Sequence, residues 1–136
     1  MTLQGEVLLN GASVDATALA LTAPISFWGG VDPVSGLISD PRHPQYGESI
    51  AGRVLLIPAT VGSSSAAAVL LELVHAGRGP AAIVLHEPDA ILLLGLIVAR
   101  EMGLTSPPAL RLDRGQYAQL DGRALQISVD GAIAVA

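Results

Sequence analysis

The sequence predicts a single α/β domain with a β-rich N-terminal half, then a strand–helix–strand–helix–strand series and a C-terminal β-hairpin. Three observations predict this fold class. The 136 residues are enough for one domain with a real core. Hydrophobic residues make up 51% of the chain and charged residues 14%, a balance that argues against disorder. In residues 53–112, short apolar runs alternate with longer helical patterns, which is typical of a parallel sheet with crossover helices.

The N-terminal half is expected to be rich in β-structure. Residues 5–9 and 18–27 carry short apolar segments bounded by glycine and proline. Residues 28–33 and 40–47 are rich in turn-forming residues and are expected to be loops. Loops of this length in a small domain are usually functional or disordered, and the tryptophan at position 28 favours order.

The C-terminal half changes to longer, alternating elements. The expected elements are strands at 53–58, 81–85 and 109–112, helices at 64–76 and 89–102, and a hairpin at 123–135. Gly77 and Gly103 follow the two helices as stop signals, and Asp130-Gly131 is expected to form the hairpin turn. The second helix is apolar nearly all round, which predicts that it is buried.

Charge and hydropathy exclude several classes of function. The net charge is −5, and the basic residues are seven scattered arginines without the clustered stripe that nucleic-acid binding requires. The longest apolar stretch, 90–99, is about half the roughly 20 residues that a membrane span needs. The N-terminus has no basic start followed by an apolar block, so we expect no signal peptide and a cytoplasmic protein.

The segment 58–65, Pro-Ala-Thr-Val-Gly-Ser-Ser-Ser, is the most informative part of the chain. It follows an apolar run and precedes a helical pattern, so three hydroxyls come directly after a glycine at a helix start. Such a start presents unpaired N–H groups and a partial positive charge. Either Ser63 or Ser64 only caps the helix, or the surplus hydroxyls bind an anion or supply a base. The pattern leaves both interpretations open.

Two further segments carry residues that could take part in chemistry. His43 lies in a loop between Pro41 and Pro44, where a histidine is more often solvated or structural than catalytic, and the segment offers too few ligands for a metal site. Asp89 is expected to cap the second helix, whereas Glu87 has no such structural explanation.

Several groups of residues in this chain match a known family in order and at its spacing. They are Ser26-Phe27-Trp28-Gly29-Gly30-Val31-Asp32-Pro33; His43-Pro44 with Gly47-Glu48-Ser49; Gly62-Ser63-Ser64 with Val69-Leu70-Leu71-Glu72; and Glu87-Pro88-Asp89 with Gly95 and Ile97-Val98-Ala99. The chain resembles the small-subunit, swivel-domain family of aconitase X over nearly its whole length. This resemblance implies one swivelling β/β/α domain over residues 1–136.

The resemblance also implies a partner, a cofactor and a reaction. The domain would dock against a large catalytic subunit that holds an iron–sulfur cluster through its own cysteines. The absence of cysteine from this chain agrees with that division, because the cluster needs thiolate ligands. Family activities are dehydrations of small hydroxy acids, either cis-3-hydroxy-L-proline or phosphomevalonate.

Site residues follow from the same resemblance. It implies that Ser63 is the base that removes a substrate proton and that Ser64 donates a hydrogen bond to the substrate. Gly62, Ser65 and His43 are the other residues expected to bind substrate.

One departure from the family pattern favours one substrate over the other. The family commonly has a basic residue before the Gly-Ser-Ser glycine, and this chain has Val61. The loss disfavours a phosphorylated substrate unless Arg42 or Arg53 replaces it, so cis-3-hydroxy-L-proline is the first choice. Two alternatives to an enzyme subunit remain. The chain could be a structural subunit that covers the partner's active site, with its serines as caps, or a free-standing domain that binds small anions at the helix start.

Overall fold

The computed structural model describes residues 1–62 and 64–136. Its elements are β1 (Thr2–Gln4), β2 (Glu6–Leu9), β3 (Val14–Ala20), the single turn α1 (Phe27–Gly30), β4 (Val54–Ile57), α2 (Ser65–His75), β5 (Ala82–Leu85), α3 (Ala90–Glu101), β6 (Ala109–Arg111), the 3₁₀ turn η1 (Arg114–Gln116), β7 (Ala124–Ile127) and β8 (Ala132–Val135). None of the described helices is long and apolar enough to cross a membrane.

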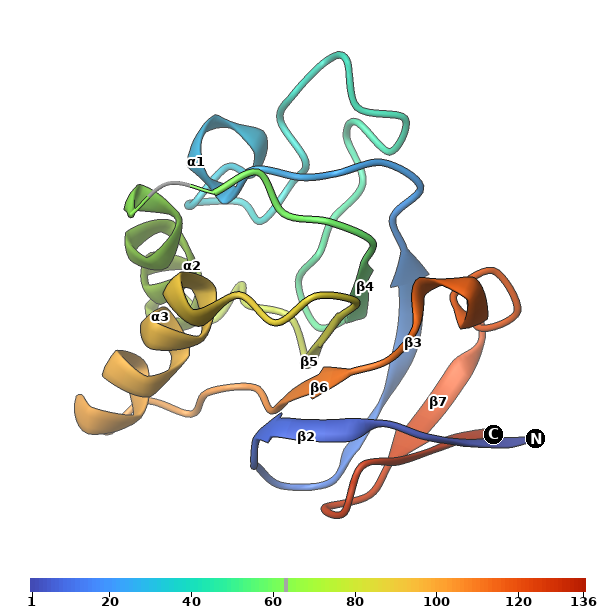
Figure 1. Cartoon of the computed structure of the whole chain (residues 1–136). Coiled ribbons are helices and arrows are strands. Elements are labelled where there is room, and N and C mark those ends of the chain that lie inside the picture. The colour runs from blue at the N-terminus through green and yellow to red at the C-terminus, as the bar shows by residue number, and fades with distance from the viewer. Residues whose placement is uncertain (63) are drawn as a thin grey trace.

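Eight strands form one curled sheet. Its two edge strands, β1 and β2, are consecutive in the sequence. The strand order is β1-β8-β7-β3-β4-β5-β6-β2, with β3, β4, β5 and β6 parallel and the other pairs antiparallel. Only Gly5 separates the edge strands β1 and β2, and its N–H donates to the Gly131 carbonyl at 2.9 Å. The two chain ends therefore lie side by side (Figure 1). This closure protects strand edges that could otherwise pair with another chain.

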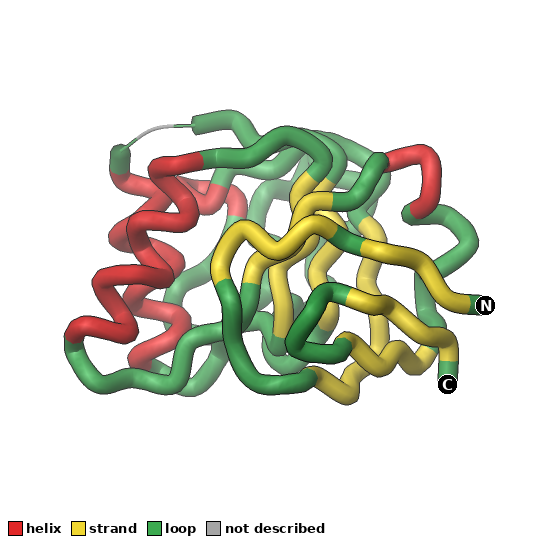
Figure 2. Tube along the Cα trace, turned by 60° about the horizontal axis from the view of Figure 1, so that its bottom comes forward, coloured by secondary structure: helices red, strands yellow, loops and turns green. Residues whose placement is uncertain are grey.

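The structure has three layers because successive strand residues point to opposite faces. On β4, Leu55 and Ile57 pack into the core beneath the two long helices, whereas Val54 and Leu56 pack into a second core against the antiparallel strands. The helices α1, α2 and α3 lie on one side of the strands, whereas the short 3₁₀ turn η1 lies on the other (Figure 2). This arrangement confirms the β/β/α domain that the resemblance implied.

The two long helices approach each other closely at Gly95. A Cβ at this position would lie 2.7 Å from the backbone oxygen of Ala67 in α2. Only glycine allows this contact without a shift of one helix. Gly95 interrupts the apolar run of α3 in the sequence, and the structure explains it as the contact point of the helix pair.

Most elements expected from the sequence are confirmed. The strands and helices of residues 53–112 and the C-terminal hairpin lie where they were predicted. In the first half, β3 begins at Val14 and ends at Ala20, earlier than the predicted segment 18–27. The apolar pattern did not predict the start of β3 because this half of the strand is exposed on one face. It therefore alternates polar residues, Asp15 and Thr17, with apolar ones.

One expectation about burial needs correction. We expected α3 to be buried all round, but only one side is, through Leu92, Gly95, Leu96 and Ala99. On the other side, Ile91, Leu94 and Ile97 are 42–52% exposed. Trp28, whose burial the sequence left open, is 64% exposed, while its neighbour Phe27 is buried.

Candidate functional site

Three loops leave the parallel strands side by side at their carboxyl ends. Ile57 at the end of β4 is in register with Leu85 at the end of β5, and Leu85 is in register with Arg111 of β6. The segments that follow, 58–62, 86–89 and 112–114, therefore begin at the same edge. In open α/β sheets this edge is where ligands bind. The structure thus places Gly62, Ser64 and Ser65 at the edge predicted for a site.

The loop that leads to α2 is held from both sides. The Ile25 N–H donates to the Ala59 carbonyl at 3.1 Å, and the Val61 N–H donates to the Ile25 carbonyl at 2.9 Å. Between these bonds, the Thr60 hydroxyl donates to Asp89 Oδ2 at 2.8 Å. A carboxylate acceptor makes this a charge-assisted hydrogen bond. The approach to the serines is therefore fixed by two neighbouring segments.

Among the described residues, no side-chain cap is seen at the start of α2. The helix begins at Ser65 with Ser64 as N-cap, and in the described chain the Ser64 side chain makes no capping hydrogen bond. Gly62, Ser64 and Ser65 are exposed, and among the described residues nothing lies within 4 Å of a Cβ built on Gly62. The capping interpretation is therefore wrong for Ser64. Ser63 lies outside the described residues, so its role as base stays a prediction.

The start of α3 is closed. Asp89 Oδ1 accepts the N–H groups of Ile91 at 3.0 Å and Leu92 at 3.1 Å. The predicted N-cap is confirmed. Because Oδ2 also accepts the Thr60 hydroxyl, one carboxylate completes α3 and anchors the loop before α2.

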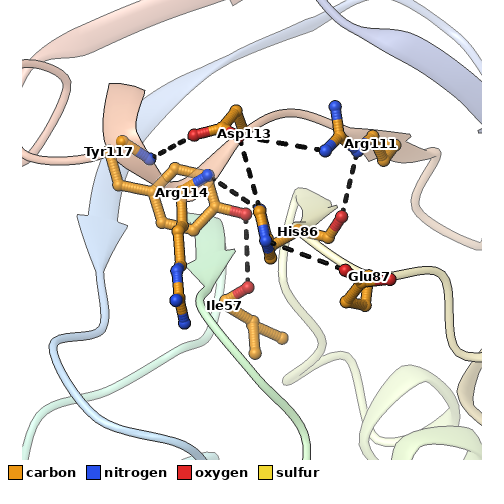
Figure 3. Close-up of polar contacts among 8 residues, drawn as sticks. Ile57, His86, Glu87, Arg111, Asp113, Arg114 and Tyr117 are labelled. Atoms are coloured by element: carbon orange, nitrogen blue, oxygen red, sulfur yellow. Dashed lines mark hydrogen bonds and ion pairs between the residues drawn. The ribbon is translucent and has the colours of Figure 1, made fainter.

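A cluster of polar side chains joins the ends of β4, β5 and β6 (Figure 3). Arg111 Nε donates to the His86 carbonyl at 3.0 Å, and the Arg114 backbone N–H donates to His86 Nδ1 at 3.1 Å. Asp113 Oδ2 lies 4.0 Å from both Arg111 Nη2 and His86 Nδ1. The sequence analysis missed this cluster, because Arg111, Asp113 and Arg114 are more than 20 residues from His86 and form no local motif.

Tyr117 ties the same region to β4. Its hydroxyl donates to the Ile57 carbonyl at 3.2 Å, and the ring is 4% exposed. Burial raises the pKa of Tyr117 well above its ordinary value, while the Arg111 charge opposes the shift. The hydroxyl is therefore a neutral donor at physiological pH.

Comparison with known proteins agrees with this fold. The family model for the aconitase X swivel domain matches residues 2–135. The chain belongs to this family. The crystal structure of Thermococcus kodakaraensis aconitase X superposes with a TM-score of 0.85 at 27% identity, over 100% of this chain and 98% of that one.

Two relatives of this chain are named for different substrates, and the chain covers very different shares of their lengths. The chain is 53% identical over 94 residues to a cis-3-hydroxy-L-proline dehydratase of Pseudomonas aeruginosa, but the match spans only 16% of that protein. It is 33% identical over 129 residues to the phosphomevalonate dehydratase small subunit of Pyrococcus furiosus, which it covers to 96%.

In the structure, the His43 side chain makes hydrogen bonds to the backbone of its own domain. The residue is 8% exposed, and its Nδ1 accepts the Gln45 N–H at 3.0 Å. The ring proton is therefore on Nε2, which lies 3.3 Å from the Ala23 carbonyl. Both ring nitrogens are used to hold the loop together. A contact between His43 and substrate stays a prediction, and it would require one of these bonds to be exchanged.

Of the two arginines considered as a replacement for the missing basic residue, Arg53 does not lie beside Val61. Arg53 donates to the carbonyls of Thr17 and Ala18 at 3.3 and 3.1 Å, at the start of β4 and so at the opposite end of the strand. Arg42 pairs with Asp40 at 3.3 Å, and its side chain is 90% exposed.

The swivel domain does not supply the ligand set of an aconitase-type cluster. Cysteine is absent from the sequence, and within residues 1–62 and 64–136 no group of three His, Asp or Glu side chains could hold a metal ion. The residues of this chain therefore do not fit an iron–sulfur cluster.

Proposed function

We propose that this chain is the small subunit of a heterodimeric hydro-lyase and that Ser63 is the base in the dehydration of cis-3-hydroxy-L-proline. One observation carries the proposal: in a member of the aconitase X swivel-domain family, the Gly62–Ser65 helix start faces the ligand-binding edge without a side-chain cap from Ser64. The 53% identity to a dehydratase named for this substrate supports the choice of reaction.

The reaction fits the chemistry of such a helix start. Dehydration removes the proton on the α-carbon and the hydroxyl on the neighbouring carbon, so a double bond forms between them and water leaves. A serine can accept the proton only if its alkoxide is stabilised, and the first N–H groups of α2 provide a positive potential for it. Ser64, whose hydroxyl is not used as a cap, donates to the substrate carboxylate. The group that assists departure of the hydroxyl comes from the partner.

The partner is a large subunit that holds the iron–sulfur cluster and covers the exposed apolar residues near the site. The relative from Pyrococcus furiosus is named a small subunit, which implies a larger one. In the Pseudomonas relative the matched stretch is a minor part of a longer protein. Trp28, Val61 and Leu94 are 64%, 58% and 52% exposed in the single chain, and a covering subunit would bury them.

Phosphomevalonate is the second candidate substrate, and the match over 96% of the Pyrococcus small subunit favours it. A phosphate requires more positive charge than a carboxylate alone. Val61 provides none, and Arg53 lies at the other end of β4. Arg111 and Arg114 do lie at this edge, so the ranking of the amino-acid substrate first rests on Val61 and on the 53% identity to the dehydratase named for it.

The test is co-expression with an aconitase X large subunit from the same organism, followed by anaerobic assay of cis-3-hydroxy-L-proline and 5-phosphomevalonate. We expect dehydration of the first by the complex and by neither subunit alone. Turnover of the second only would replace the substrate, and failure to form any complex would refute the subunit assignment. A stable, cluster-loaded complex that acts on neither would contradict both substrates.

The base is tested in the same complex with Ser63→Ala. Removal of a positioned base is expected to lower turnover by roughly 10²–10⁴-fold or more, with assembly unchanged. Ser128→Ala is the matched control, because Ser128 follows β7 beside the start of β3, at the opposite edge of the sheet. Normal turnover by Ser63→Ala, with complex formation intact, would instead favour a purely structural subunit.

A further inference from the structure

The imidazole of His86 is held in one protonation pattern by the backbone. Its Nδ1 accepts the N–H of Arg114 at 3.1 Å. A backbone N–H can only donate, so Nδ1 carries no proton and the neutral ring has its proton on Nε2. The backbone of His86 is held as well, because its carbonyl accepts from Arg111 Nε at 3.0 Å.

The Nε2–H is a donor without a close acceptor among the described residues. The nearest charged group is Glu87 Oε1 at 3.8 Å, which is too long for a hydrogen bond. The Glu87 side chain is 81% exposed, whereas the His86 side chain is 19% exposed. A carboxylate on an exposed side chain thus already lies near a donor that is held in place (Figure 3).

This donor lies beside the loop that carries the proposed base. Ile57 and Leu85 are paired in register, so Pro58 and His86 are the first residues beyond the sheet on neighbouring strands. Three residues after His86, Asp89 is bonded to Thr60 at 2.8 Å, which fixes the two loops together. Both loops therefore meet the same ligand-binding edge.

We propose that His86 contacts the substrate directly and that its Nε2–H donates a hydrogen bond to the substrate carboxylate. The inference rests on the proposed function and extends it to substrate recognition. The substrate oxygen takes the position now occupied by the Glu87 carboxylate, which swings into solvent. Asp113 is the second carboxylate beside the His86 ring. Its negative charge is balanced by Arg111, whose Nη2 lies 4.0 Å from Asp113 Oδ2.

The geometry also assigns His86 the role of a neutral donor and not of a proton source. A histidine that gives up a proton as an acid starts as the imidazolium, with protons on both nitrogens. A proton on Nδ1 would face the Arg114 N–H and break that bond. The neutral ring, in contrast, keeps its bond to Arg114 while Nε2–H binds an anion.

Two substitutions of His86 test the roles of its two ring nitrogens separately. His86→Asn keeps an acceptor near the Nδ1 position for the Arg114 N–H and removes the Nε2 donor. His86→Gln places an amide N–H near the Nε2 position and has no acceptor at the Nδ1 position for the Arg114 N–H. A hydrogen bond to a charged group is worth enough that we expect a KM about 10- to 100-fold higher in His86→Asn, with kcat changed much less. His86→Gln should keep a KM nearer to wild type but unfold at a lower denaturant concentration.

The opposite pattern would overturn the inference. A wild-type KM in His86→Asn, with a raised KM only in His86→Gln, would mean that His86 acts solely through Arg114. His75→Asn is the control for the loss of a histidine, since His75 is exposed in the last turn of α2. Wild-type activity of the complex reports on the proposed function independently of these variants.

A binding measurement decides the inference even if the complex shows no turnover. Pyrrole-2-carboxylate is a planar five-membered ring with the same carboxylate, and it can be titrated into the complex while the side-chain ¹H–¹⁵N resonance of His86 is followed by NMR. We expect the Nε2–H resonance to shift on saturation and the His86→Asn complex to bind the probe about 10- to 100-fold more weakly. Equal affinity for the probe with and without the His86 ring would refute the contact.

Discussion

The starts of α2 and α3 lie at the same edge of the sheet but are completed in different ways. At α3, the Asp89 carboxylate accepts two helix N–H groups and the Thr60 hydroxyl. At α2, the N-cap Ser64 makes no capping hydrogen bond in the described chain. One start is therefore capped by a described side chain, whereas at the other the hydroxyl of Ser64 is not used as a cap.

The residue types explain this division. A carboxylate only accepts hydrogen bonds, so Asp89 suits a permanent cap. A hydroxyl both donates and accepts, so Ser64 can contact either the helix or a bound molecule. The bond from Thr60 to Asp89 makes the two starts interdependent, because the capped start of α3 fixes the loop that leads to α2. Substitutions that separate stability from function test this comparison.

The largest loss of stability is expected from Gly95→Ala, which disturbs the contact that sets the two helices side by side. A Cβ would lie 2.7 Å from the Ala67 backbone oxygen, so one helix must shift. Overpacking costs about 1–3 kcal/mol, and a clash with backbone belongs at the upper end, so against a helix-propensity gain of about 1 kcal/mol the net loss is about 2 kcal/mol. Chemical denaturation should show a net loss, whereas Ala68→Ser on the exposed side of α2 should stay within about 0.5 kcal/mol. A more stable Gly95→Ala variant would contradict the close contact.

Asp89→Ala should have the next largest effect. It removes the acceptor of two α3 N–H groups and of the Thr60 hydroxyl, and loss of such a cap costs about 1–2 kcal/mol. Asp89→Asn keeps a side-chain oxygen for the helix and should recover most of that stability, since asparagine is an equally good N-cap. Urea unfolding of the two variants measures the difference. Equal stability of Asp89→Ala and wild type would remove the distinction between the two helix starts.

The sequence was sufficient for the elements whose cause is local. Within the predicted runs, Val54–Ile57 and Ala82–Leu85 are buried on both faces, and Gly77 and Gly103, with φ of +73° and +78°, end their helices as expected. Asp89 was predicted as a cap because capping depends on the residue and its immediate neighbours.

What the sequence did not show depends on contacts between distant segments. The closure of the sheet by residues 2–9 requires pairing with β8 and β6, more than 100 residues away. The tautomer of His86 is set by Arg114, and no spacing rule connects the two. The apolar outer side of α3 was read as buried because composition does not tell a core from a surface that another subunit can cover.

The hydrogen bond from Tyr117 to Ile57 at the end of β4 is expected to make a smaller and pH-dependent contribution to stability. Tyr117→Phe leaves the Ile57 carbonyl without its side-chain donor, and we expect a loss of about 0.5–1.5 kcal/mol at neutral pH. Burial raises the pKa of Tyr117, so the folded state resists ionisation. The neutral hydroxyl contributes its full stability below the ordinary tyrosine pKa of about 10, and that contribution falls as the pH rises above it. The stability difference between wild type and Tyr117→Phe should therefore shrink above about pH 10 in denaturation curves. A difference that stays constant up to alkaline pH would argue against a buried, neutral hydroxyl.

Ser64→Ala is expected to have the smallest effect on stability, although it changes the N-cap residue of α2. An ordinary N-cap serine contributes about 1 kcal/mol, but Ser64 makes no capping bond in the described structure, so the change should stay within about 0.5 kcal/mol. In the complex with the large subunit, the same substitution should raise the KM, because the hydroxyl then binds substrate and not the helix. Thermal denaturation of the single chain and steady-state kinetics of the complex measure the two quantities separately. A loss of about 1 kcal/mol with unchanged KM would show that α2 is capped like α3, and the two helix starts would then differ in residue type but not in role.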